Sequence, residues 1–102
     1  MNSVLTTRAD AIAQLCRKYG VRSLYAFGSI VRPDFEPNRS DADFLVEFEP
    51  VSAADRMRRY FALRRELSQL VARPVDLTEE GSIRNPYVLE NIACQKRLLY
   101  AA

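Results

Sequence analysis

The segment from Ser40 to Glu49 reads SDADFLVEFE, and from Asp41 to Glu49 its residues alternate in the period-two pattern of a β-strand. One face of this strand carries the apolar residues Ala42, Phe44, Val46 and Phe48. The other face carries Asp41, Asp43, Leu45, Glu47 and Glu49. The segment therefore predicts a strand that packs one face against a core and presents carboxylates on the opposite face.

Elements of alternating type surround this strand. Apolar residues at helical spacing predict a first helix that ends at Gly20, with Thr7 and Asp10 as a capping pair. A second capping pair, Ser52 and Asp55, precedes a long amphipathic helix. The remaining predicted elements are strands over 21–27, 74–78 and 97–100, a short turn and loop over 30–40, and helices over 53–71 and 88–93. This order predicts an α/β fold in which a small mixed sheet is flanked by helices, as a single domain over residues 1–102.

The composition limits the kinds of functional site that the protein can have. Histidine is absent, which excludes histidine metal sites and Ser-His-Asp triads, so that any reaction has to use carboxylates, hydroxyls, arginines and the backbone. The net charge of +2 is too small to argue for nucleic acid. No apolar run is long enough to span a membrane, and residues 1–4 lack a signal-peptide pattern, so we expect a cytoplasmic protein.

Three acids form the candidate catalytic and metal-binding group. Asp41 and Asp43 are separated by one residue on a strand, so both carboxylates project from one face. Adjacent like charges cost free energy unless something neutralises them, and carboxylate oxygens are good ligands for Mg²⁺. Asp76 is the acid of the predicted 74–78 strand. If the two strands are neighbours, Asp76 completes a set of three carboxylates suited to phosphoryl transfer.

A candidate phosphate-binding turn comes just before this group in the sequence. Gly28 and Ser29 follow a predicted strand, where glycine lets the backbone approach a ligand and the serine hydroxyl can meet a phosphate oxygen. Arg32 can lie on the same side of the turn and add charge-assisted contacts.

These motifs resemble the signature of the minimal nucleotidyltransferase (MNT) family, within the polymerase-beta superfamily. The resemblance lies in Gly28-Ser29, Arg32 and the SDADFLVEF run over 40–48, in the PVDL segment over 74–77, and in residues 85–100. It covers essentially the whole chain. Three features depart from the usual pattern: a gap from Ser29 to Asp41 that is one residue longer, Pro33 after the arginine, and Ala42 between the two acids.

The resemblance implies a polymerase-beta-like nucleotidyltransferase fold, ATP as substrate, Mg²⁺ as cofactor and transfer of a nucleoside monophosphate, in this case AMP. It also implies a HEPN-type toxin as partner, which an MNT antitoxin neutralises by adding AMP to a tyrosine, by forming a complex, or by both. The acceptor, the base preference and the oligomeric state stay open.

Two other functions remain as alternatives. The chain could be a non-catalytic antitoxin that neutralises a partner by contact. For the enzyme, which would dock its partner beside the acids, the apolar docking residues are expected in the C-terminal segment, at Tyr87, Leu98, Leu99 and Tyr100. The chain could also bind RNA through the arginines of 56–65, although a solvated helix face is the plainer interpretation of that cluster. Cys16 and Cys94 are expected to be small buried side chains. The aromatic residues expected in the core are Tyr25, Phe27, Phe44, Phe48, Tyr60 and Phe61.

Overall fold

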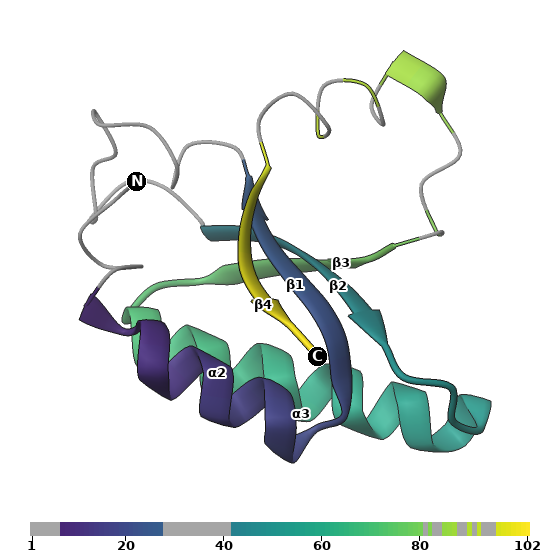
Figure 1. Ribbon diagram of the computed structural model, residues 1–102, viewed down its shortest axis with the longest axis horizontal. Coiled ribbons are helices and arrows are strands. Elements are labelled where there is room, and N and C mark those ends of the chain that lie inside the picture. The colour runs from purple at the N-terminus through teal and green to yellow at the C-terminus, as the bar shows by residue number, and fades with distance from the viewer. Residues whose placement is uncertain are drawn as a thin grey trace.

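The structure is a computed structural model and describes residues 7–27, 42–80, 82, 85–87, 90, 92 and 96–102. Two long helices and a sheet make up the described part (Figure 1). Its elements, in chain order, are α2 (Ala9–Lys18), β1 (Val21–Phe27), β2 (Ala42–Phe48), α3 (Ala53–Val71), β3 (Val75–Glu79) and β4 (Arg97–Ala101). The strands and the long helix lie where the sequence predicts them. Of the helix predicted over 88–93, the structure describes Glu90 and Ile92, and both are helical.

The four strands form one mixed sheet in the order β3-β2-β1-β4. β1 pairs antiparallel with both β2 and β4, whereas β2 and β3 are parallel. Two parallel neighbours need a crossover connection, and α3 supplies it between β2 and β3. The crossover thus places the strand of Asp76 directly beside the strand of Asp43.

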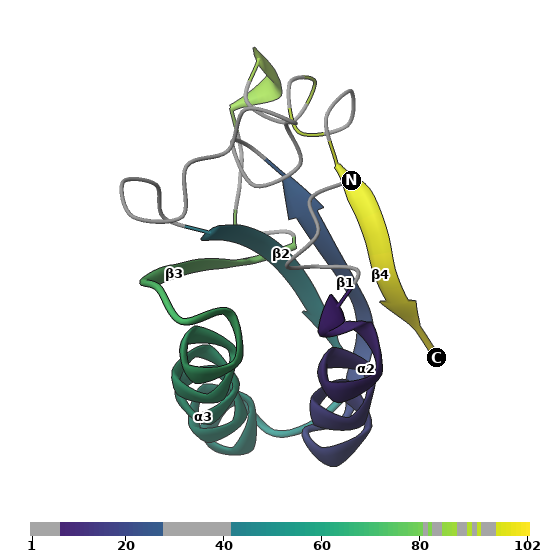
Figure 2. The same ribbon diagram turned by 90° about the vertical axis from the view of Figure 1, so that its left-hand side faces the viewer.

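Both helices cover the same face of the sheet (Figure 2). The core lies between them and the strands, and Phe44, Leu24 and Leu63 are among its largest fully buried side chains. On β2, Ala42, Phe44 and Val46 belong to this core, as the alternation predicts. Cys16 is also fully buried, in agreement with its expected role, whereas Cys94 lies outside the described residues.

Helix α2 ends as predicted but begins differently. Its N-cap position is Arg8, which makes no side-chain capping hydrogen bond, so the predicted Thr7–Asp10 capping pair is wrong. At the other end, Gly20 has a φ of +64° and turns the chain into β1. Tyr19 donates a hydrogen bond from its hydroxyl to Glu66, which ties α2 to α3.

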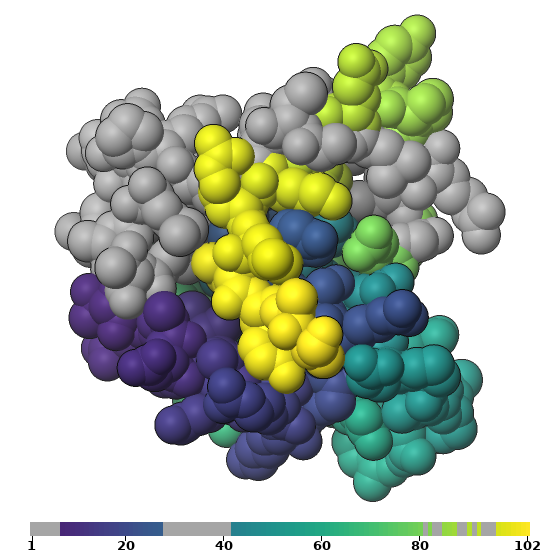
Figure 3. Space-filling view, in the orientation of Figure 1, coloured from purple at the N-terminus to yellow at the C-terminus, as the bar shows by residue number. Residues whose placement is uncertain are grey.

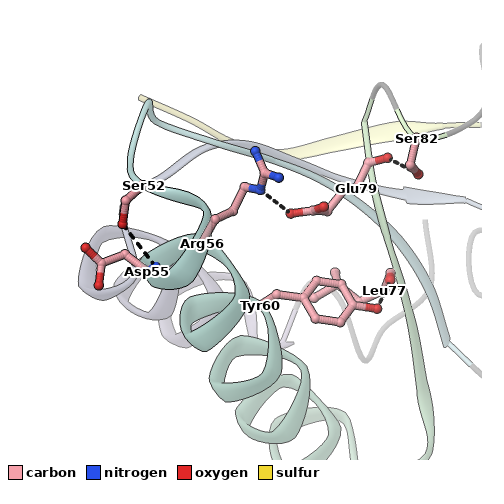
Figure 4. Close-up of polar contacts among 7 residues, drawn as sticks. All are labelled: Ser52, Asp55, Arg56, Tyr60, Leu77, Glu79 and Ser82. Carbon is pink, nitrogen blue, oxygen red and sulfur yellow. Dashed lines mark hydrogen bonds and ion pairs between the residues drawn. The ribbon is translucent and has the colours of Figure 1, made fainter.

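Helix α3 begins with the predicted cap, because the Ser52 hydroxyl accepts a hydrogen bond from the Asp55 backbone N–H at 3.3 Å (Figure 4). Its C-cap, Ala72, is left-handed with a φ of 57°. The apolar stripe of α3 is only partly buried. Met57 is 64% exposed and Phe61 is 56% exposed, so the prediction that Phe61 belongs to the core is wrong. Both lie in the N-terminal half of α3.

Candidate functional site

Two of the three predicted acids lie side by side on the sheet. Asp43 of β2 and Asp76 of β3 are register partners in the parallel pairing, so their Cα atoms are about 4.8 Å apart. The flanking residues Ala42, Val75 and Leu77 are buried on the helix side. Because side chains alternate along a strand, Asp43 and Asp76 project from the face that the helices do not cover. Asp43 is half-buried and Asp76 is exposed.

The end of β1 lies next to this acid pair. Phe27, the last residue of β1, is the register partner of Asp43 on the other side of β2. The chain therefore leaves β1 beside Asp43, and Gly28 is the next residue in the sequence. Gly28, Ser29, Arg32 and Asp41 themselves lie outside the described residues, and their roles stay predictions.

The acid pair fits a divalent cation. Two carboxylates on adjacent strands and on one face offer oxygen atoms, the ligands that Mg²⁺ prefers, and a bound cation would offset their mutual repulsion. In the described part of the chain, no group of three or more metal-ligating side chains forms. The third predicted acid, Asp41, is adjacent in sequence to Ala42, the residue that starts β2 and donates its backbone N–H to the Pro74 carbonyl at 3.0 Å.

A basic side chain also lies on the acid-bearing face, and the sequence did not point to it. Lys96 places its ammonium 4.3 Å from the centre of the Tyr25 ring. Tyr25 pairs with Leu45 of β2 and Leu98 of β4, in the row next to Phe27 and Asp43. The sequence gives no signal for this contact, because the position of Lys96 over Tyr25 depends on how β4 pairs with β1.

Cys16, the cysteine within the described residues, takes no part in metal binding or catalysis. Burial raises the pKa of the Cys16 thiol to about 12, and the nearby Arg17 lowers it by less. A thiol in the core with this pKa stays protonated and out of reach of a substrate.

Burial also lowers the pKa of Arg73, whose Nε donates to the Val71 carbonyl at 2.7 Å. No described helix combines the length and apolar character needed to cross a membrane.

Comparison with known proteins places the chain in a family. The nucleotidyltransferase domain family matches residues 9–99. A candidate protein adenylyltransferase of Methanocaldococcus jannaschii is 38% identical over 86 residues, which are 84% of this chain and 82% of the relative.

Two solved structures share the fold. A candidate minimal nucleotidyltransferase matches with a TM-score of 0.66 and 29% identity, over 95% of each chain. A chain from the complex of a tri-AMPylated Shewanella oneidensis HEPN toxin with MNT antitoxin matches with a TM-score of 0.64 and 18% identity, over 96% of this chain and 73% of that one. Together with the side-by-side acids on an α/β sheet, these matches make the protein a member of the nucleotidyltransferase domain family, with the fold of the minimal nucleotidyltransferases.

Proposed function

We propose that this chain works in the cytoplasm as a protein adenylyltransferase, which transfers AMP from ATP to a hydroxyl of a HEPN-type toxin. The observation that carries the proposal is the pairing of Asp43 with Asp76 on the uncovered face of the sheet. The resemblance to a candidate adenylyltransferase and to a complex that contains an AMPylated toxin supports the choice of AMP and of the partner.

The predicted site residues would have two separate roles in the reaction. Gly28, Ser29 and Arg32 bind the triphosphate, while Asp41, Asp43 and Asp76 hold Mg²⁺. Bound there, Mg²⁺ supplies positive charge that favours deprotonation of the attacking hydroxyl and stabilises the leaving group.

The acceptor oxygen forms a bond to the α-phosphorus, and the bond from that phosphorus to the oxygen bridging to the β-phosphate breaks. Pyrophosphate leaves, and the hydroxyl proton passes to a carboxylate of the site. The acids hold the reacting groups in line and so lower the entropic part of the barrier.

The metal site has a direct test. A nonhydrolysable ATP analogue with Mg²⁺ should raise the melting temperature of the wild type, because ligand binding stabilises the folded state. Asp43→Asn should remove most of this rise. Glu47→Gln is the matched control, since Glu47 lies on the same face of β2 and its carboxylate pairs with Arg22 at 3.6 Å. An equal rise in wild type, Asp43→Asn and Glu47→Gln would contradict the assignment of Asp43.

The transfer itself is tested by co-expression with the protein encoded next to this chain, which the proposal expects to be a HEPN-type toxin, followed by intact-mass analysis of that protein. The wild type should add the mass of AMP, and the double variant Asp41→Asn with Asp43→Asn should add none while it still binds the toxin. If the wild type neutralises the toxin without a mass change, and the double variant does so equally well, the non-catalytic antitoxin is the correct function.

The phosphate-binding turn has its own test. Ser29→Ala should weaken binding of the ATP analogue by about 1–2 kcal/mol, the scale of one hydrogen bond to a charged group. The melting temperature without nucleotide should stay close to that of the wild type. Titration calorimetry measures the affinity, and an unchanged value would show that Ser29 does not contact the phosphates.

A further inference from the structure

An exposed groove runs between α3 and the edge strand β3. We call it the α3–β3 groove and define it by Met57, Phe61, Arg64, Arg65, Pro74 and Val75. It consists of two hollows, of about 410 and 270 Å³, that share Phe61 as a common wall. Met57 and Phe61 are one helical turn apart and both are more than half exposed, so they form an exposed apolar strip along the groove.

The outward carbonyls of the edge strand β3 are already occupied. The Pro74 carbonyl accepts from Ala42 of β2, so the carbonyls of Val75, Leu77 and Glu79 face away from the sheet. Each of these three carbonyls already accepts a hydrogen bond. Arg64 Nε donates to Val75 at 3.3 Å, Tyr60 Oη donates to Leu77 at 2.5 Å, and Ser82 Oγ donates to Glu79 at 2.7 Å. Figure 4 shows the last two contacts.

These contacts disfavour a β-ladder at this edge, so we expect a partner that fills the groove to bind through side chains. From Met57 to Arg65 the helix rises about 12 Å, which is close to two turns of a second helix laid alongside. Such a helix would contact the strip with apolar residues at i and i+4, the spacing of helix-in-groove recognition.

The charge of the groove indicates which charged residues the partner helix carries. Arg64 and Arg65 line its larger hollow, and none of the described residues that line it is acidic. Within the described part of the chain, neither arginine makes an ion pair with a carboxylate. At the other end, Arg56 Nε is engaged with Glu79 at 3.4 Å (Figure 4). Acidic residues on the partner helix would therefore meet Arg64 and Arg65, one turn beyond the apolar contact.

We propose that the α3–β3 groove is the docking site for an acidic amphipathic helix of the protein that this chain modifies. The larger hollow ends at Pro74 and Val75, and Val75 is followed directly by Asp76. Val75 faces the helices and Asp76 faces the opposite side of the sheet, so a partner seated there lies at the edge of β3 and its hydroxyl would reach the acid pair around that edge. The proposal rests on the proposed function in one respect only: it takes the docked protein to be the acceptor of AMP.

The first test measures affinity for the HEPN-type toxin by titration calorimetry. Met57→Ser with Phe61→Ser should weaken binding about tenfold or more, as expected for apolar anchors at the centre of an interface. Arg65→Glu should weaken it as well and remove much of its salt dependence. Two controls match these changes: Leu98→Ser with Tyr87→Ser, which removes the other two large apolar side chains that are exposed among the described residues, and Arg17→Glu on α2. All variants are first compared by thermal melting, since the changed residues are exposed.

The controls distinguish the α3–β3 groove from the C-terminal strand as the docking site. If the Leu98 and Tyr87 variant loses binding while the groove variants bind like the wild type, the docking site is at the C-terminal strand and this proposal is wrong. Figure 3 shows that strand, β4, across the middle of the face turned to the viewer.

A second test does not depend on the HEPN partner. A displayed library of 16-residue amphipathic helices is selected against the wild type and counter-selected against the Met57 and Phe61 double variant. Acidic helices should be enriched. Enrichment of basic or uncharged helices, or equal retention by the double variant, would overturn the groove assignment.

The two tests separate two kinds of failure. A wild type that binds acidic helices but not the toxin would show that the partner in the proposed function is wrong and the groove assignment is right. Tight binding of a single-stranded RNA probe that depends on Phe61 and Arg65, without enrichment of acidic helices, would overturn the groove assignment in favour of nucleic acid.

Discussion

At the scale of single residues, the turn between α2 and β1 depends on Gly20. Its φ of +64° is costly for residues with a Cβ, and a Cβ placed there would lie 2.2 Å from Arg59 Nη1. Gly20→Ala should therefore lower the free energy of unfolding by about 1–2 kcal/mol, and urea denaturation measures it. Gly20→Ala combined with Arg59→Ala relieves the clash but not the backbone strain. An alanine variant as stable as the wild type would contradict this account.

Cys16 gives the protein a pH dependence at alkaline pH. Its pKa rises from 9.0 to about 12 on folding, so above pH 9 the unfolded chain loses a proton that the folded chain keeps. The contribution of Cys16 to stability is therefore complete below pH 9 and declines toward pH 12, by up to about 1.4 kcal/mol per pH unit. In a Cys94→Ala background, Cys16→Ala should flatten the fall in melting temperature between pH 9 and 11. An unchanged slope would contradict the burial of the thiol.

At the scale of elements, α3 ends at a strained residue. Ala72 closes the helix with a φ of 57° and a ψ of 41°, a conformation in which its Cβ is unfavourable, and its N–H bonds to the Ser68 carbonyl. Ala72→Gly should raise the free energy of unfolding by about 0.5–1 kcal/mol, because relief of this strain outweighs the extra entropy of glycine in the unfolded chain. Thermal melting measures the gain. Ala62→Gly, inside the same helix, is the control and should destabilise the protein by a similar amount.

The sequence predicted most elements because each carried a strong local signal. The alternation over 42–48 fixed which face of β2 is buried, and Ser52 with Asp55 fixed the start of α3. The exposure of Phe61 could not be predicted, because periodicity gives the direction of a side chain and not the extent of the sheet that covers it. The left-handed Ala72 was missed because glycine or asparagine is the usual signal for such a cap.

At the scale of the whole molecule, the pairing of Asp43 with Asp76 could be predicted in outline. A strand, a helix and a second strand favour parallel neighbours, and alternation then places both acids on one face. Long-range contacts outside this unit could not be predicted. Lys96 lies over Tyr25, and Tyr60 and Arg64 reach the carbonyls of β3, only because the strands and α3 come together in a particular register.

These last contacts protect the open edge of the sheet. An edge strand with free carbonyls is a template for pairing with another chain, and β3 is an edge whose outward carbonyls at Val75 and Leu77 are occupied by Arg64 and Tyr60. Tyr60→Phe with Arg64→Met frees both carbonyls and keeps most of the packing. Without any partner, this double variant should self-associate at lower protein concentration than the wild type in sedimentation velocity.

The control for the edge is a chemically equal change elsewhere, Tyr25→Phe with Arg22→Met, on a strand that has neighbours on both sides. It should sediment like the wild type. If both double variants do so, the hydrogen bonds from α3 only orient the helix against β3. If only the Tyr60 and Arg64 variant associates, α3 has two roles at this edge: it keeps the strand closed to a β-ladder, and it leaves Phe61 and Met57 as the surface that a partner can contact.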